Sequence, residues 1–378
     1  MTLAAEQAAE EDRLGLVVDR LAEDRAAMLA RVTTKVTTKQ LSTARGCVLG
    51  LVLGDAIGAA DAEVASSSTL RATSAAQLAC FTIEGVIRAH VRMTHKGICH
   101  PPGLVWHAYA RWASMQGISG ITPWEKEVWP DGWLAQVPVL AARRGSAPAT
   151  VTALQNGTMG QIDKPAGSSV GAHALTRVLP AGLVGDWVAE PGRFAAEIAA
   201  TTHAGEAVHA AAVGARIVAN IVKGQGIEEA VQQSESEGMS LLKQPFDSPV
   251  ASAVETARSQ PRQTTKLAHL TPDARAAAAL AGGVYVALSF PERDQIRDAL
   301  LFAASGSNGN HVAAVAGALL GAAHGADALP LDWVSRLELA WVADVLARDL
   351  IAEFVDKPSG TEYTPGGDPH WWNRYPGW

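Results

Sequence analysis

The side chains that could carry chemistry in this chain are scattered histidines and carboxylates, and their spacing fits no common catalytic motif. No two of the 11 histidines stand four residues apart, as the ligands of a helical zinc site do. The three cysteines, Cys47, Cys80 and Cys99, lack the paired spacing of metal sites and disulfide frameworks. No Walker loop, dinucleotide fingerprint or strand–turn–helix nucleophile elbow is present. The common hydrolase and nucleotide-binding classes therefore gain no support.

The apolar residues are arranged as in helices. Of the 378 residues, 48% are hydrophobic and only 6% are aromatic, so a large core can be built chiefly from Ala, Leu and Val. Runs such as Ala276–Leu288 and Val312–Ala323 lack the period-two alternation of strands. We therefore expect an all-α fold, with no sheet of three or more strands.

Proline, glycine and small polar residues separate the predicted helices, for example at 101–103, 130–132 and 305–310. Besides a helix from Arg45 to Gly58, the pattern predicts helices near 75–93, 104–116, 133–144, 168–184, 191–223, 226–243, 249–260, 272–290, 293–304, 312–325 and 332–355.

Glycines recur at every fourth residue in the first of these helices, at Gly46, Gly50, Gly54 and Gly58. This spacing places all four on one face of a helix. Without side chains there, another backbone can approach closely, so we expect a tightly packed central helix.

The chain is expected to consist of an arm and one main domain. Residues 3–31 predict a charged helix with a narrow apolar stripe, and Val-Thr-Thr-Lys then occurs twice within 32–39, where poor helix propensity indicates a hinge. We assign 1–40 to the arm and hinge and 41–378 to a single helical domain. Its C-terminal tail ends in closely spaced tryptophans and a tyrosine, which should pack back on the domain.

The charge balance and the chain start limit the expected partners and location. The formal net charge is −7 and no dense basic cluster is present, so neither nucleic acid nor an anionic membrane is an expected partner. The N-terminus is acidic and alanine-rich rather than a secretory signal, and the apolar runs are interrupted before the ~20 residues of a membrane span. Together with the unpaired cysteines, this predicts a cytoplasmic protein.

Six short segments occur in a fixed order along the chain. They are Gly-Leu-Val-Leu-Gly-Asp-Ala-Ile-Gly-Ala (50–59), Gln-Leu-Ala-Cys-Phe-Thr-Ile-Glu-Gly (77–85), Pro-Asp-Gly-Trp-Leu (130–134), Arg-Val-Leu-Pro-Ala-Gly-Leu (177–183), Thr-His (202–203) and Ala-Val-Ala-Gly-Ala-Leu-Leu-Gly-Ala (314–322). In this order they resemble the motifs of the ADP-ribosylglycohydrolase family. The resemblance covers about residues 45–378 and implies a compact orthogonal helical bundle with one central cleft.

The resemblance also implies where two Mg²⁺ ions would bind, and both segments are altered. In the family, an S/T-D-D-T segment precedes the second motif and a D-x-D-S/T segment precedes the last. Here these become Thr-Ser-Ala-Ala (73–76) and Asn-Gly-Asn-His (308–311). Two neighbouring magnesium ions need several carboxylates to offset their mutual repulsion. The sequence therefore predicts no metal and no cofactor.

The family's glycine-rich phosphate-binding loop is changed as well, to Gly-Ala-His-Ala at 171–174. Histidines thus stand at 173 and 311, where the family motifs have none. A neutral imidazole can act as an acid or base without a metal, although these rings could instead simply fill the space of the missing cations. The candidate catalytic residues are His311, His173 and Asp55. The candidate cleft residues are Thr73, Ser74, Glu63, Asn308, Asn310 and Gly171.

Three hypotheses about function remain open. The first is a protein that does not hydrolyse ADP-ribosyl bonds and binds a nucleoside-like or other small ligand in the central cleft, or a protein partner. The second is a repurposed, metal-independent enzyme that uses the histidines and Asp55 on a different small molecule. The third is a structural or scaffold protein that uses its N-terminal helix and its aromatic tail, with self-association or a protein partner through the N-terminal helix.

Overall fold

The computed structural model describes residues 35–60, 67–121, 129–185, 187–238 and 249–377. The chain divides into two units, Met1–Thr37 and Thr38–Trp378. The arm helix expected at 3–31 lies outside the described residues, as does Glu63.

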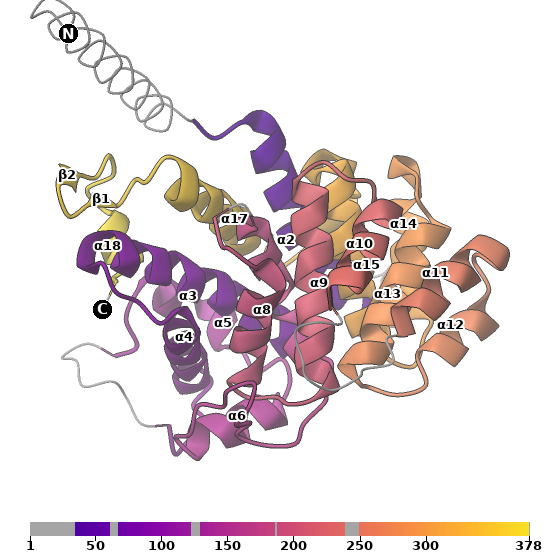
Figure 1. Cartoon of the computed structure of the whole chain (residues 1–378), viewed down its shortest axis with the longest axis horizontal. Helices are drawn as coiled ribbons and strands as arrows, with labels where there is room; N and C mark the ends of the chain where they lie inside the picture. Colours follow the sequence, from indigo (N-terminus) through magenta and orange to yellow (C-terminus); the bar gives the residue numbers. More distant parts are fainter. Residues whose placement is uncertain (1–34, 61–66, 122–128, 186, 239–248, 378) are drawn as a thin grey trace, which may run out of the picture. The chain divides into compact units, whose positions relative to one another are not determined.

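The second unit is helical, which confirms the all-α prediction, and its one described sheet is a two-stranded antiparallel pair (Figure 1). Its longer helices, in chain order, are α2 (Thr38–Ala59), α3 (Ser74–Lys96), α4 (Pro101–Met115), α6 (Pro148–Gln155), α8 (Pro191–Ala200), α9 (Glu206–Val222), α10 (Ile227–Gly238), α11 (Pro249–Ser259), α12 (Thr264–Leu270), α13 (Ala276–Ser289), α14 (Ile296–Ala304), α15 (Gly309–His324) and α17 (Ala340–Val355). The short elements are η2 (Trp133–Gln136), α5 (Pro138–Ala141), α7 (His173–Thr176), η3 (Leu179–Val184), η4 (Arg293–Gln295), η5 (Ala326–Ala328), α16 (Leu331–Val334), β1 (Gly360–Thr361), β2 (Thr364–Pro365) and α18 (Trp371–Arg374).

Helix α2 packs along α15 through its glycines, as their spacing predicts. A Cβ added at Gly46 would lie 1.9 Å from the carbonyl oxygen of Gly321, and one at Gly50 would lie 2.1 Å from that of Gly317. At Gly54 the added Cβ would meet the carbonyl oxygen of Ala313 at 2.0 Å. The two helices therefore touch backbone to backbone, and this contact places the C-terminal half of α2 beside the N-terminus of α15.

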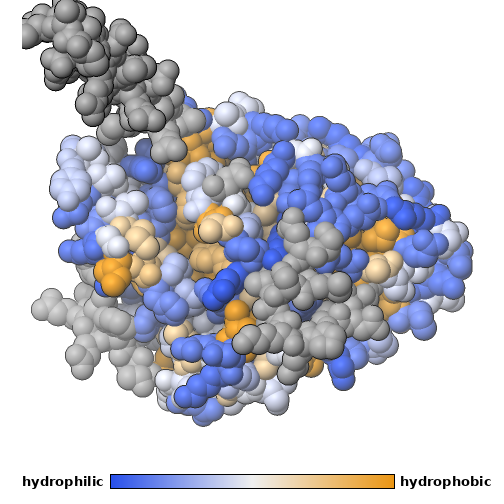
Figure 2. Space-filling view, viewed as in Figure 1, coloured by the Kyte–Doolittle hydropathy of each residue, from blue (hydrophilic) through white to orange (hydrophobic). Residues whose placement is uncertain are grey.

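Around this pair, α3 packs on α4 and α17, and α13 packs on α15 and α11. In Figure 1, α3 and α4 lie to the left of α2 and α9, and α11–α14 lie to the right. Figure 2 shows hydrophilic residues over much of the same face, with hydrophobic areas near its middle. By length and composition α2 could cross a membrane, but 78% of its most apolar window is buried, as in the core helix of a compact domain.

A buried charge network joins α3 and α4. Glu84 is fully buried and pairs with Arg88 (3.0 Å) and with Arg111, while Arg88 also contacts Asp131 at 3.0 Å. The carboxylate charge of Glu84 is thus neutralised by buried arginines, so this residue has a structural role.

The aromatic tail packs on the body as expected, as far as it is described. Trp371 and Tyr375 are 3% and 0% exposed. The Tyr375 hydroxyl donates to Asp349 on α17 at 2.6 Å, and Arg374 pairs with the same carboxylate. Trp372 stacks edge-on against His95 of α3.

Several predicted helices are divided in the structure. The segment 191–223 forms two helices, α8 and α9, because the intervening Gly205 takes a positive φ of 54°. The segment 332–355 likewise divides into α16 and α17. Helix α2 begins at Thr38, inside the segment interpreted as a hinge and seven residues before the expected start at Arg45.

Candidate functional site

Asp55 lies where three helices meet, on α2 between the N-termini of α3 and α15. It is fully buried. Its carboxylate accepts the backbone N–H of Thr73 at 2.6 Å, the Thr73 hydroxyl at 2.8 Å and the Asn310 side-chain amide at 3.2 Å. Thr73 also caps α3, since its hydroxyl accepts the N–H of Ala75 at 3.1 Å. Residues 55, 73 and 310, far apart in sequence, thus form one hydrogen-bonded cluster.

The electrostatics of Asp55 differ from those of an exposed carboxylate. Burial raises the pKa of Asp55 to about 6, although the hydrogen bonds from Thr73 and Asn310 oppose that rise. The carboxylate is therefore mostly ionised at pH 7, and the described groups that stabilise it are neutral donors.

The other residues of the first altered segment offer no anionic oxygen to the cluster. Ala75 and Ala76 are fully buried, and Ser74 is 2% exposed. The backbone N–H of Ser74 donates to the Arg144 carbonyl at 3.2 Å, and Gly145 lies so close that an added Cβ would be 2.5 Å from the Ser74 hydroxyl oxygen. Residues 74–76 are therefore engaged in packing contacts.

The second altered segment forms the first turn of α15. Asn308 is its N-cap residue and is 8% exposed, and its Nδ2 has no hydrogen-bond partner among the described residues. His311 is 7% exposed, and its Nδ1 lies 2.8 Å from the Thr176 hydroxyl of α7. Only Asn310 of this segment reaches Asp55 through its side chain in the described contacts.

His173 and His311 lie together, so two of the three predicted catalytic residues are neighbours. Their ring centroids are 5.0 Å apart, with the rings nearly perpendicular. Burial lowers the pKa of His173 to about 3, and the neighbouring His311 and Arg177 contribute to this shift. Burial also lowers the pKa of His311 to about 4. Both imidazoles are therefore neutral at pH 7. Within the described part of the chain, no hydrogen bond joins either ring to Asp55.

The loop that precedes α7 has its backbone donors already committed. Gly171 forms an isolated antiparallel bridge with Arg275, and the N–H of Ala172 donates to the Ala274 carbonyl at 3.0 Å. The N–H of Gly171 faces the Ser169 hydroxyl at 3.4 Å. A loop that cradles a diphosphate needs free N–H groups, and these two are not free.

Sequence reasoning missed a buried cation beside the histidines. Arg177 is fully buried, and it donates to the hydroxyls of Thr150 (2.7 Å) and Thr202 (2.5 Å). Its guanidinium stacks on the ring of Tyr109 at 4.3 Å. Burial and the charge of Arg177 hold the pKa of His203 well below its usual value. Arg177 opens the segment 177–183, but nothing in that segment indicates that its partners are uncharged.

The described residues do not fit a pair of magnesium ions. Within the described ranges, no group of three or more His, Cys, Asp or Glu side chains is placed to hold a metal ion. Asp55 is the carboxylate of the described cluster, and its two oxygens already accept three hydrogen bonds. Hard cations require several such oxygens. We therefore derive no chemical step through magnesium.

The neutrality of the cluster can be tested by Asn310→Asp. The new carboxylate would lie against Asp55, where Asn310 now donates at 3.2 Å, and two carboxylates this close cannot both ionise without a large penalty. We expect a loss of about 3 kcal/mol in the free energy of unfolding at pH 8, and a smaller loss near pH 5, where the pair can share a proton. Urea unfolding at both pH values measures this.

The control for this substitution is Asn310→Ala, which removes the hydrogen bond without adding charge. It should cost about 1 kcal/mol at either pH. Equal stability of the Asn310→Asp variant and the unaltered protein at pH 8, without divalent cations, would show that the cluster tolerates a second charge.

Comparison with known proteins adds three findings. A search of curated proteins finds no match. One solved structure, titled "ADP-ribosylglycohydrolase-related protein complex", is similar in fold with a TM-score of 0.56 and 20% sequence identity, and the similarity covers 83% of this chain and 99% of that one. The sequence model of the family described as ADP-ribosylglycohydrolase matches residues 36–360. Since this match spans most of the sequence, the chain belongs to the ADP-ribosylglycohydrolase family.

Proposed function

We propose that this protein does not hydrolyse ADP-ribosyl bonds and instead binds a nucleoside-like or other small ligand in the cleft around Asp55, His173 and His311. The observation that carries the proposal is the hydrogen bonding of Asp55. Its oxygens are occupied by Thr73 and Asn310, and the remaining residues at the positions of the family's metal segments are neutral.

The surroundings of the histidines support a binding role. Hydroxyl, amide and neutral imidazole groups recognise neutral hydrogen-bonding ligands such as nucleosides without a large desolvation penalty. The guanidinium of the nearby Arg177 is fully buried and donates its hydrogen bonds to the hydroxyls of Thr150 and Thr202. The bridge from Gly171 to Arg275 disfavours a diphosphate at that loop.

A metal-independent enzyme is the second candidate, and the His173–His311 pair favours it. If Nδ1–H of His311 donates to Thr176, its Nε2 carries the lone pair and is available as a base. However, general bases are most effective when their pKa lies near the working pH, and these rings have pKa values of about 3 and about 4. We therefore rank catalysis second.

Hydrolysis is tested with ADP-ribosylarginine and an ADP-ribosylserine peptide, each with and without Mg²⁺. We expect no release of ADP-ribose above the protein-free control, and no change in melting temperature on adding Mg²⁺, because the described residues form no group of carboxylates that would gain binding free energy from the ion. Release of ADP-ribose by the unaltered protein would refute the proposal.

The binding role is tested by titrating adenosine and ADP-ribose into the protein by calorimetry. Binding of adenosine should weaken in His173→Ala and remain unchanged in His370→Ala, which alters an exposed histidine of the tail. Equal binding by both variants, or no binding of either compound, would remove the support for a nucleoside-like ligand.

A further inference from the structure

A cavity lies between the C-terminal end of α4, helix α6 and the loop 142–147. Its volume is about 520 Å³, within the range of small-molecule sites. Its lining residues come from positions 116–119, from the loop that carries Arg143 and Gly145, and from the Val151 and Gln155 face of α6. None of them is acidic, and one is a cation.

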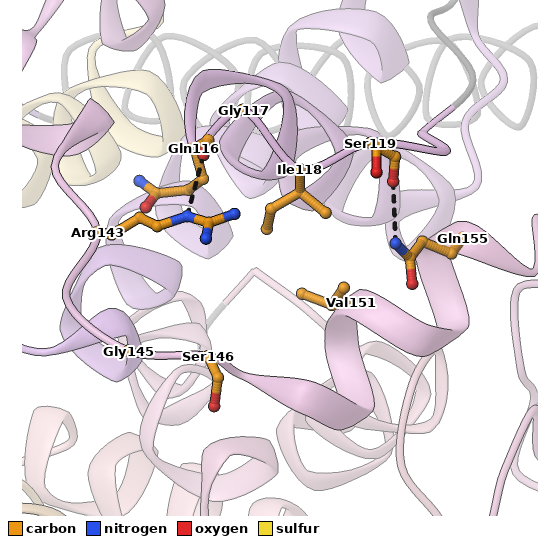
Figure 3. A pocket seen from close by; sticks show the side chains of 9 residues that line it. All are labelled: Gln116, Gly117, Ile118, Ser119, Arg143, Gly145, Ser146, Val151 and Gln155. Carbon is orange, nitrogen blue, oxygen red and sulfur yellow. Dashed lines mark hydrogen bonds between the residues drawn. The ribbon is translucent and has the colours of Figure 1, made fainter.

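Arg143 supplies the charge of this cavity. Its Nε donates to the Gln116 carbonyl at 3.3 Å, which anchors the guanidinium, and among the described residues it has no ion pair. The next residue, Arg144, behaves differently, because it forms a two-pronged pair with Glu338 (3.0 and 2.7 Å). Figure 3 shows the terminal nitrogens of Arg143 directed towards the open space. They form a fork of donors of the kind that binds carboxylate or phosphate.

The remaining walls provide an apolar slot with a polar end. Figure 3 shows Ile118 and Val151 approaching each other across the cavity, with Arg143 to one side and Ser119 and Gln155 to the other. Gln155 Nε2 donates to the Ser119 carbonyl at 2.9 Å, which fixes the amide and leaves its oxygen as an acceptor. A flat apolar body fits between such side chains, while its charged head meets the guanidinium.

An unpartnered polar atom lies in the same wall. Gln116 is 6% exposed, and its Nε2 donates to the Leu140 carbonyl at 2.5 Å, whereas its Oε1 is buried without a hydrogen-bond partner among the described residues. As an acceptor, this oxygen is complementary to a hydrogen-bond donor such as a bridging water and not to the anionic oxygens of a ligand.

We propose that this cavity binds a small organic anion, with its carboxylate or phosphate head on Arg143 and its apolar body between Ile118 and Val151. The site is distinct from the hydrogen-bonded cluster of residues 55, 73 and 310. The loop that carries Arg143 and Gly145 also holds the first turn of α3, since the Arg144 carbonyl accepts the N–H of Ser74 at 3.2 Å. An anion bound here would therefore contact the same loop that holds the segment positioning Thr73 beside Asp55.

The test uses benzoate and phenyl phosphate as probes and neutral benzamide as the matched control, each titrated into the full chain by calorimetry. We expect both anions to bind, and the tighter of the two identifies the preferred head group. Benzamide should bind at least tenfold more weakly than the tighter anion, because it lacks the charge that strengthens a hydrogen bond by about this factor. Benzamide binding as tightly as the anions would overturn the proposal.

Two variants locate the binding. Arg143→Gln should weaken the anions about tenfold, whereas Arg258→Gln, which alters an exposed arginine on α11, should leave them unchanged. Val151→Trp should fill the slot and abolish binding without touching the charge. Undiminished binding of both anions by Arg143→Gln and Val151→Trp would place their site elsewhere.

Discussion

Replacing Gly50 by alanine should cost about 5 kcal/mol or more in the free energy of unfolding, and replacing it by valine should leave no folded protein. The first methyl group would lie 2.1 Å from the Gly317 carbonyl oxygen, far inside van der Waals contact. The contact is reciprocal, because a Cβ added at Gly317 would lie 2.1 Å from the Gly50 carbonyl oxygen. Neither helix can therefore move easily to make room. A loss of this size equals the whole stability of many domains.

Urea unfolding of Gly50→Ala, or its yield in soluble form, measures the effect. The matched control is Gly226→Ala, since a Cβ added at Gly226 meets nothing within 4 Å. That variant should lie within about 1 kcal/mol of the unaltered protein. A Gly50→Ala protein as stable as the control would mean that α2 and α15 do not approach as closely as described.

Acidification from pH 7 to pH 4.5 should destabilise the protein through its buried imidazoles, of which His173 and His311 are two. The pKa values of His173 and His311 are about 3 and about 4 in the folded protein, against 6.5 ordinarily. Both groups stay neutral in the fold while the unfolded chain takes up protons. Their contribution is therefore fully present above pH 6.5 and is lost as the pH falls towards 4.

The size of this effect follows from the shifts. Each pKa unit corresponds to about 1.4 kcal/mol, so the two histidines together lose about 5 kcal/mol between pH 6.5 and pH 4.5. Asp55 has the opposite sign, because its pKa is raised to about 6 and the folded state takes up its proton first. Protonation of Asp55 therefore stabilises the folded protein by about 2 kcal/mol over the same pH range. The net expectation is a marked loss of stability in acid.

Urea unfolding at a series of pH values tests this expectation. The double variant His173→Gln and His311→Gln should lose about 5 kcal/mol less on acidification than the unaltered protein. His370→Gln, which alters an exposed histidine of the tail, should follow the unaltered protein. If all three proteins lose stability in parallel between pH 6.5 and pH 4.5, the two imidazoles are not held neutral by the fold.

The sequence predicts the helical class and much of the helix pattern, because apolar periodicity reflects burial directly. It also predicts the contact face of α2, since a glycine at every fourth residue leaves one side of a helix bare for a neighbouring backbone. It fails where a short element depends on its surroundings. Helices α6 and α12 are only 8 and 7 residues long, and the predicted helix at 133–144 is reduced to η2 and α5.

Some features of the site can likewise be predicted from the sequence, and others cannot. The altered metal segments can be located from the family motifs, and so can the two added histidines. The hydrogen bonds of Asp55 cannot, because they depend on how residues 55, 73 and 310 meet in space. The buried Arg177 and the cavity beside Arg143 have no sequence signal, since each depends on which neutral groups the fold brings around a cation.

The backbone contact between α2 and α15 has a consequence for how this protein can change. Both helices bring their site residues together through main-chain atoms, at Gly54 with Ala313 and at Gly58 with Asn310. Side-chain chemistry at positions 55, 308 and 310 is therefore not needed to hold the helices in register. Designers could use the fold as a scaffold, installing new polar residues at the ends of these two helices while leaving the glycine face untouched.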